Sequence, residues 1–128
     1  MTAYQEGFGI FDLDAKTFQL IHPSAGDGRG PGAPWGGSWS PDGKWLAVPA
    51  WDADPGRRGI WLVEANNPEN EVFLGASTFS PLWSPDGKWL AYHDYQSEQG
   101  TNQVWLYNPN TGERLKTSLP PQAWAVDW

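Results

Sequence analysis

The residues of this chain best suited to proton transfer are a histidine and the carboxylate that follows it, His93 and Asp94. Such a pair acts as a general acid or base when a nucleophile lies within hydrogen-bond reach. No nucleophile is evident, because cysteine is absent and Gly36-Gly37-Ser38-Trp39-Ser40 departs from the Gly-x-Ser-x-Gly elbow of hydrolases at its last position. We therefore predict that the chain binds rather than catalyses.

Two further segments contain residue types that bind ions. Asp52-Ala53-Asp54-Pro55-Gly56 resembles the opening of a calcium loop, with carboxylates two residues apart. The twelfth position of such a loop would be Val63, where a bidentate Glu is needed. The glycine-rich stretch from Ser24 to Pro34 lacks the Lys of a phosphate loop and the glycine spacing of a dinucleotide site. We interpret both segments as surface loops, and we predict no metal and no cofactor.

The overall charge narrows the possible partners. The 128 residues carry a formal net charge of −7, with a pI near 4.5 and no cluster of Lys or Arg. Nucleic acid is therefore not an expected partner, because phosphate binding needs clustered positive charge. Glu6, Asp12 and Asp14 stand where a signal peptide needs a basic start and an apolar stretch. We expect no signal peptide in the chain as given and no membrane insertion, and the compartment stays undetermined.

An internal repeat is the strongest signal in the sequence. The nine residues Trp39-Ser40-Pro41-Asp42-Gly43-Lys44-Trp45-Leu46-Ala47 recur without change as Trp83 to Ala91, 44 residues later. A second pattern occurs three times, at 9–14, 59–64 and 103–108, each time with an aliphatic residue followed by an aromatic one. A period in the forties is typical of one four-stranded blade of a β-propeller.

The Ser-Pro-Asp-Gly segments have the chemistry of tight turns. Pro fixes φ at the second position, Asp bonds back to the backbone, and Gly accepts a positive φ. Each segment is predicted to join two antiparallel strands, with Asp42 and Asp86 as structural residues. Further turns are expected at 14–16, 66–70 and 108–113. Since the chain has ten Trp and one Met, aromatic side chains must fill the core between the strands.

These residues resemble the TolB-like Pro-Asp repeat, whose signature is Trp-Ser-Pro-Asp-Gly-Lys followed by an apolar residue and Ala, with an Ile-Trp-like strand further on. The resemblance covers essentially the whole chain. It implies an all-β fold of propeller blades, each with four antiparallel strands running from the axis outward. It says little about function, because propellers host many unrelated activities. The implied first strands end at Trp39, Trp83 and Trp128, and the later strands lie near 45–50 and 89–93, near 9–13, 60–64 and 104–108, and near 17–21, 71–75 and 114–118.

The strand map predicts about three blades in one partial propeller spanning 1–128. Two full repeats lie near 35–75 and 78–118, and a split blade combines 1–21 with 122–128. Three blades cannot close a ring, since propellers have about 4–8 of them. A homodimer that closes a six-bladed ring is therefore favoured over a trimer.

The last strand of the chain is the predicted assembly element. Trp124, Val126 and Trp128 alternate along it, and it has no hairpin partner in its own sequence. In the dimer this strand would complete a blade of the partner chain. The alternative is that the sequence is a fragment of a longer propeller protein.

The long connections indicate the candidate binding surface. In a propeller of this type the loops 22–34, 52–59 and 94–103 lie on one face, and the short turns lie on the other. The predicted function is a non-catalytic module that self-associates and binds a protein or peptide on this face. The alternative is the propeller accessory segment of a larger enzyme, similar to that of prolyl oligopeptidases. The candidate binding residues are Asp27, Arg29, Asp52, Asp54, Arg57, Arg58, His93 and Asp94.

Overall fold

The computed structural model describes residues 7–23, 33–34, 37–51, 54–96, 100–120 and 128, and within them the fold is all-β. A 3-10 turn, η1 (Pro55–Arg57), lies between two of the strands. The expected fold class is therefore confirmed at the level of all-β structure. The strands are β1 (Gly7–Asp12), β2 (Thr17–Pro23), β3 (Ala33–Pro34), β4 (Ser38–Trp39), β5 (Trp45–Trp51), β6 (Gly59–Glu64), β7 (Asn67–Ala76), β8 (Thr78–Trp83), β9 (Leu90–Gln96), β10 (Thr101–Tyr107) and β11 (Arg114–Lys116).

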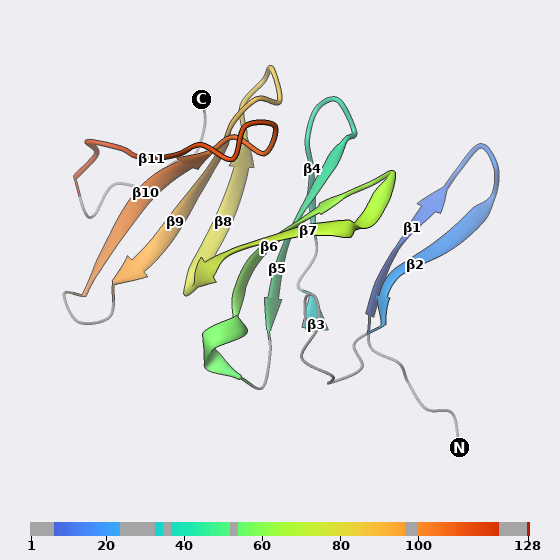
Figure 1. Ribbon diagram of the computed structural model, residues 1–128, viewed down its shortest axis with the longest axis horizontal. Coiled ribbons are helices and arrows are strands. Elements are labelled where there is room, and N and C mark those ends of the chain that lie inside the picture. The colour runs from blue at the N-terminus through green and yellow to red at the C-terminus, as the bar shows by residue number, and fades with distance from the viewer. Residues whose placement is uncertain (1–6, 24–32, 35–36, 52–53, 97–99, 121–127) are drawn as a thin grey trace.

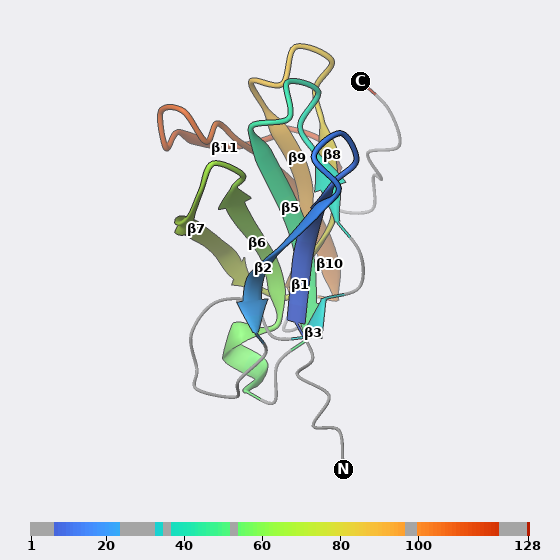
Figure 2. The same ribbon diagram turned by 90° about the vertical axis from the view of Figure 1, so that its right-hand side faces the viewer.

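The strands form three antiparallel sheets that follow one another in chain order (Figure 1). The first sheet is the hairpin β1-β2. The second has the order β3-β5-β6-β7, with β4 beside β3 on the same edge of β5, and the third has the order β8-β9-β10-β11. None of the sheets closes on itself. Viewed from the hairpin side, the sheets lie one behind another (Figure 2).

The second and third sheets repeat one another in register. Leu46 pairs with Val63 between β5 and β6, and Leu90 pairs with Tyr107 between β9 and β10. Both members of the second pair lie 44 residues after their counterparts. The edge strands agree as well, because Trp39 pairs with Leu46 and Trp83 pairs with Leu90. The sequence period is therefore also the period of the strand pairing.

The two Ser-Pro-Asp-Gly turns have the same hydrogen bonds, as their identical sequences predict. The Ser40 hydroxyl donates to Asp42 Oδ1 at 2.6 Å and accepts from the backbone N–H of Trp45 at 2.9 Å. Asp42 Oδ1 also accepts from the Lys44 N–H at 3.1 Å, and Gly43 has a φ of 72°. These bonds, the Ser40 hydroxyl first, lower the pKa of Asp42 below its usual value. The second turn repeats each contact with Ser84, Asp86, Gly87, Lys88 and Trp89.

The main core lies between the second and third sheets. Strand β6 is buried from Gly59 to Val63 without interruption, so both of its faces are covered. The core cluster takes apolar side chains from both sheets, and burial raises the pKa of Tyr92, one of its members, to about 12. The cluster comprises Trp45, Ala47, Ile60, Leu62, Leu74, Trp83, Leu90, Tyr92 and Tyr107, with Val72 and Trp105 packed against it.

The turn expected at 66–70 is wrong. The chain turns at Ala65 and Asn66, and β7 begins at Asn67. The register between β6 and β7 shifts at this point, so residues 68–70 form an irregular bulge within the strand. The Asn70 side chain donates to the Glu64 carboxylate at 2.7 Å and fastens the bulge to β6. Tertiary pairing therefore overrides the local Asn-Pro turn signal here.

The structural role of Asp42 can be tested by removing its carboxylate. In Asp42→Ala the Ser40 hydroxyl and the Lys44 N–H lose their acceptor, so we expect the free energy of unfolding to fall by about 1 kcal/mol. Asp42→Asn keeps an acceptor oxygen at the same place and should lose less. Urea unfolding followed by Trp fluorescence measures both values. Equal losses in the two variants would contradict this role.

Acid stability provides a second test of the turns. The pKa values of Asp42 and Asp86 are lowered in the folded protein, in both cases chiefly by the serine hydroxyl. A lowered carboxyl pKa stabilises the fold above the unfolded pKa of about 3.9, and this contribution is lost as the pH falls through the folded value. We expect the double variant Asp42→Asn, Asp86→Asn to lose less stability than the parent between about pH 5 and pH 2. An unchanged pH profile would show that the carboxylates do not act as charged acceptors.

Candidate functional site

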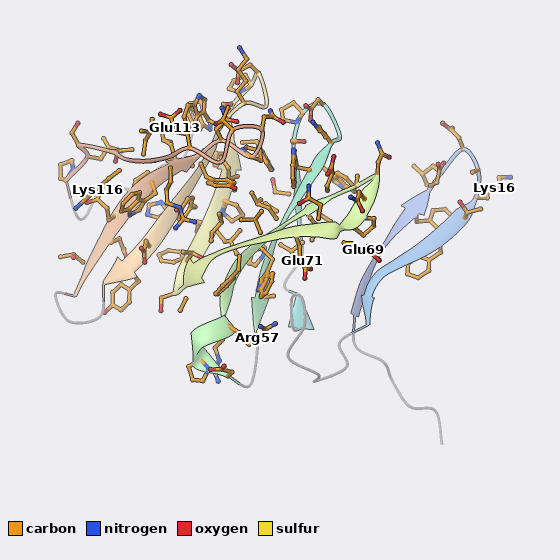
Figure 3. The ribbon with its side chains drawn as sticks, viewed as in Figure 1. Lys16, Arg57, Glu69, Glu71, Glu113 and Lys116 are labelled. Atoms are coloured by element: carbon orange, nitrogen blue, oxygen red, sulfur yellow. The ribbon has the colours of Figure 1, made fainter. Side chains whose placement is uncertain are left out.

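The η1 turn, in the described part of the predicted loop 52–59, lies at one end of the sheets. Figure 3 shows Arg57 at this end, whereas the labelled Lys16 and Glu113 lie at the other end, with the short turns. The connection from β7 to β8, residues 76–78, also reaches the η1 end (Figure 1). Arg57 and this connection therefore lie opposite the short turns.

The η1 turn is built by local sequence chemistry. Asp54 caps it, because its Oδ1 accepts from the Gly56 N–H at 2.9 Å, and Pro55 supplies a preset φ at the first position. The turn holds Arg57 with its guanidinium carbon 5.0 Å from the centre of the Trp61 ring. The Trp61 indole donates to the Arg57 carbonyl at 3.4 Å. Arg57 is thus engaged in holding η1 against β6 by a cation–π contact.

The neighbouring Arg58 lines a pocket between the second and third sheets. The pocket has a volume of about 390 Å³, within the range of small-ligand sites. A Cβ at Gly59 would collide with the carbonyl oxygen of Gly75 and lie 2.7 Å from the Thr78 hydroxyl, so only glycine fits there. The walls are largely apolar and come from Pro49, Ala50, Arg58, Gly59, Ser77, Thr78, Phe79 and Tyr95.

Ser77 connects the second and third sheets by backbone hydrogen bonds at the floor of this pocket. Its N–H donates to the Arg58 carbonyl at 2.9 Å, and its own carbonyl accepts from the Tyr95 N–H at 3.1 Å. These bonds hold Ser77 at a φ of 64°, a left-handed value that is costly for a residue with a side chain. Next to it, the Thr78 hydroxyl accepts from the Ile60 N–H at 2.8 Å and donates to the Gly75 carbonyl at 2.7 Å. The pocket is therefore bounded by firmly held backbone.

His93 lies beneath the pocket rather than on its surface. The imidazole is fully buried and stacks on Phe79, with ring centres 5.3 Å apart. Burial lowers the pKa of His93, because the charged form loses its hydration. The neutral imidazole supports the Phe79 wall. The neighbouring Asp94 is partly buried at the end of β9, opposite Thr78 and Gln103 in the strand register.

Five of the predicted site residues have no described position. Asp27, Arg29, Asp52, Trp124 and Val126 lie outside the described residues.

Among the residues that are described, no group of three His, Cys, Asp or Glu side chains is placed to hold a metal ion. No helix in that part of the chain has the length and apolar character needed to span a membrane.

Trp128, the one described residue of the predicted assembly strand, makes a contact that repeats within the chain. Its indole N–H donates to the Leu82 carbonyl at 3.2 Å. Trp83 donates in the same way to the Ser38 carbonyl of the second sheet at 2.9 Å. Leu82 lies 44 residues after Ser38, and Trp128 lies 45 after Trp83. Trp128 therefore makes the same contact with the third sheet that Trp83 makes with the second.

Of the eight residues that line this pocket, only Arg58 was named as a binding residue from the sequence, and Ser77, Phe79 and Tyr95 were among the seven that were not. They come together because two sheets pack, which no local motif encodes. A signal existed in the repeat, since Phe79 and Tyr95 lie 44 residues after Trp35 and Trp51. Aromatic side chains at matching places in successive repeats indicate a surface shared between neighbouring sheets.

The burial of His93 makes stability depend on pH. A histidine whose folded pKa is lowered is easier to protonate in the unfolded chain, so stability falls as the pH drops below the unfolded value of about 6.5. We expect His93→Phe, which keeps a ring against Phe79, to reduce this loss between about pH 7 and pH 5. Thermal unfolding at several pH values measures it, with His22→Phe as the matched control. Equal effects of both substitutions would contradict the assignment.

In chemical terms, the site offers an apolar pocket that Arg58 helps to line, with a firmly held backbone floor. His93, the residue best suited to proton transfer, is buried there and stacked against Phe79. The geometry suits holding an apolar side chain. Comparison with protein-family models found no match to this chain, and comparison with curated proteins found none.

Proposed function

We propose that this chain is a non-catalytic module of a β-propeller, and that it works by assembling with a second copy of itself. The second and third sheets correspond to one blade each, and the β1-β2 hairpin to the outer half of another. The 44-residue register and the stacking of successive sheets support this assignment. The resemblance to TolB-like repeats agrees with it.

The observation that carries the proposal is the indole contact of Trp128. Trp83 is the last residue of the inner edge strand of the third sheet, and it is 7% exposed between two sheets. Trp128 makes the same bond one repeat further on and is 46% exposed. It thus occupies the place that the inner-strand Trp of a further sheet would take. Trp39, the counterpart of Trp83 on β4, is 43% exposed.

A second copy would supply neighbouring sheets for both the first and the third sheet of the chain. Three blades per chain and about 4–8 blades per ring agree with six blades from two chains. The two-fold axis of such a dimer gives two identical seams, each joining the end of one chain to the beginning of the other. The ring then covers both apolar end faces and leaves no sheet edge open at its centre.

The same ring presents the long-loop face to a protein or peptide. On this face the inter-sheet pocket would accept an apolar side chain between Phe79 and Tyr95, next to Arg58. Tyr95 is 44% exposed and stands at the pocket where a ligand makes contact. Arg57 lies against Trp61 and belongs to the scaffold of this face.

Sedimentation velocity at micromolar concentration tests the assembly directly. We expect a dimer, and we expect Trp128→Ala to raise its dissociation constant about 30-fold, the effect of losing an interface residue worth about 2 kcal/mol. Deleting Ala123 to Trp128 should abolish the dimer. Tyr95→Ala, which truncates an equally exposed aromatic residue at the pocket, should leave association unchanged. A monomer at every concentration would refute the assembly and assign the missing sheets to other parts of a longer polypeptide.

A further inference from the structure

The exposed apolar residues of the described chain concentrate at its two ends. On the first sheet, Phe11, Leu13 and Phe18 are 55%, 80% and 63% exposed. A second group belongs to the third sheet and the segment after it, and Trp39 stands alone on the edge of the second sheet. The second group comprises Tyr95, Leu115, Leu119 and Trp128, each between 41% and 46% exposed.

Phe11 and Phe18 form one side of the hairpin. They are directly paired between β1 and β2, so both side chains project from the same face. In the second sheet the corresponding pair is Trp61 and Phe73, which stack with ring centres 4.7 Å apart. Trp61 is only 6% exposed. The hairpin therefore carries the same aromatic pair, uncovered.

Phe11, Trp61 and Trp105 hold the same position in the three copies of the pattern, and Trp105 shows which surface such an aromatic residue covers. It packs against the core cluster that includes Ile60 and Leu62 of the second sheet. An aromatic residue at this position thus packs onto the aliphatic face of the sheet before it. For Phe11 the described chain contains no preceding sheet.

The third sheet has the matching aliphatic face, and no other sheet formed by the described residues covers it. Val104 and Leu106 lie 44 residues after Ile60 and Leu62. Val104 is 2% exposed and thus already buried within the chain, whereas Leu106 is partly exposed and Leu62, its counterpart, is completely buried. A pocket of about 220 Å³ lies over this face. Its walls are Leu82, Ala91, Val104, Leu106, Thr117, Leu119 and Trp128.

We infer that the outer face of the third sheet is the docking site for the β1-β2 hairpin of a second copy, with Phe11 and Phe18 lying over Val104 and Leu106 as Trp105 lies over the second sheet. This inference rests on the proposed function and names the surfaces that meet at its seam. The pocket has room for a phenyl ring, since an aliphatic cavity of about 150 Å³ holds benzene.

A second copy is the occupant that the arrangement favours. Within one chain the hairpin lies on the far side of the second sheet, with β1 in contact with β3, while the third sheet covers the opposite side (Figure 2). Its aromatic face is thus directed away from the third sheet of its own chain. In the two-fold pair, each hairpin is held between its own second sheet and the third sheet of the other copy. A single kind of contact then covers the hairpin residues and the exposed apolar residues around Leu106, whereas Tyr95 lies apart, at the pocket beside Arg58.

Cross-linking between two single-cysteine variants tests this docking, because the chain has no cysteine of its own. Phe11→Cys and Leu106→Cys proteins are mixed, equilibrated and treated with a short bismaleimide. We expect a covalent dimer. Thr17→Cys, on the opposite face of the hairpin, is the matched control and should give little product with Leu106→Cys. Leu115→Cys, opposite Leu106 on β11 and 41% exposed, repeats the test at a position that tolerates substitution.

Sedimentation of the same mixtures separates this inference from the proposed function. A dimer with no excess of the Phe11→Cys product over the Thr17→Cys control, at both Leu106→Cys and Leu115→Cys, would overturn the docking and leave self-association standing. A monomer in every mixture would overturn both. Circular dichroism of each variant confirms that it is folded before cross-linking.

Discussion

The burial of both faces of a sheet is the constraint on which this structure depends. Strand β6 has no exposed residue from Gly59 to Val63, and its apolar side chains alternate between two neighbouring layers. A sheet of this composition is stable only between two others, because each apolar face left in water forfeits about 25 cal/mol per Å². The second sheet has both neighbours within the chain. The third sheet repeats this composition and has one neighbouring sheet among those that the described residues form.

The connection between the sheets is as specific as the packing. A single residue, Ser77, bonds to the carbonyl of Arg58, just before β6, and to the N–H of Tyr95 in β9. The hydroxyl of Thr78 bonds to backbone groups of β6 and β7. Arg114 adds a bond from the third sheet to the Leu74 carbonyl of the second, at 3.2 Å. These polar contacts connect the two sheets at defined backbone positions, in addition to the apolar packing between them. The pocket beside Arg58 is lined by two of these residues, Ser77 and Thr78.

Features set by residues that are neighbours in the sequence were predicted correctly, whereas features set by contacts between sheets were not. The turn at Asp42 and its copy at Asp86 were predicted because proline, aspartate and glycine act within six residues, and the strands around them followed. The bulge at 68–70 was missed because it depends on the register of β7 against β6, which the Asn-Pro signal does not encode. Arg58 was placed on the correct loop. The aromatic wall of its pocket was missed, and His93 was expected on the surface instead of under Phe79, because both result from two sheets meeting.

The indole-to-carbonyl bond between successive sheets has a direction. Trp83 reaches back to the sheet before it, and Trp128 does the same, so each sheet gives a donor at one side and an acceptor at the other. Both bonds lie within one chain, so they fix the direction in which sheets follow one another along it. In the proposed assembly the copies would continue this direction, and growth would stop only when the rotation from sheet to sheet returned the last sheet to the first. With that rotation slightly changed, the same succession of sheets would form an open helical filament. The backbone contacts of Ser77 and Thr78, which connect one sheet to the next, would then help to decide between a ring of fixed size and a polymer.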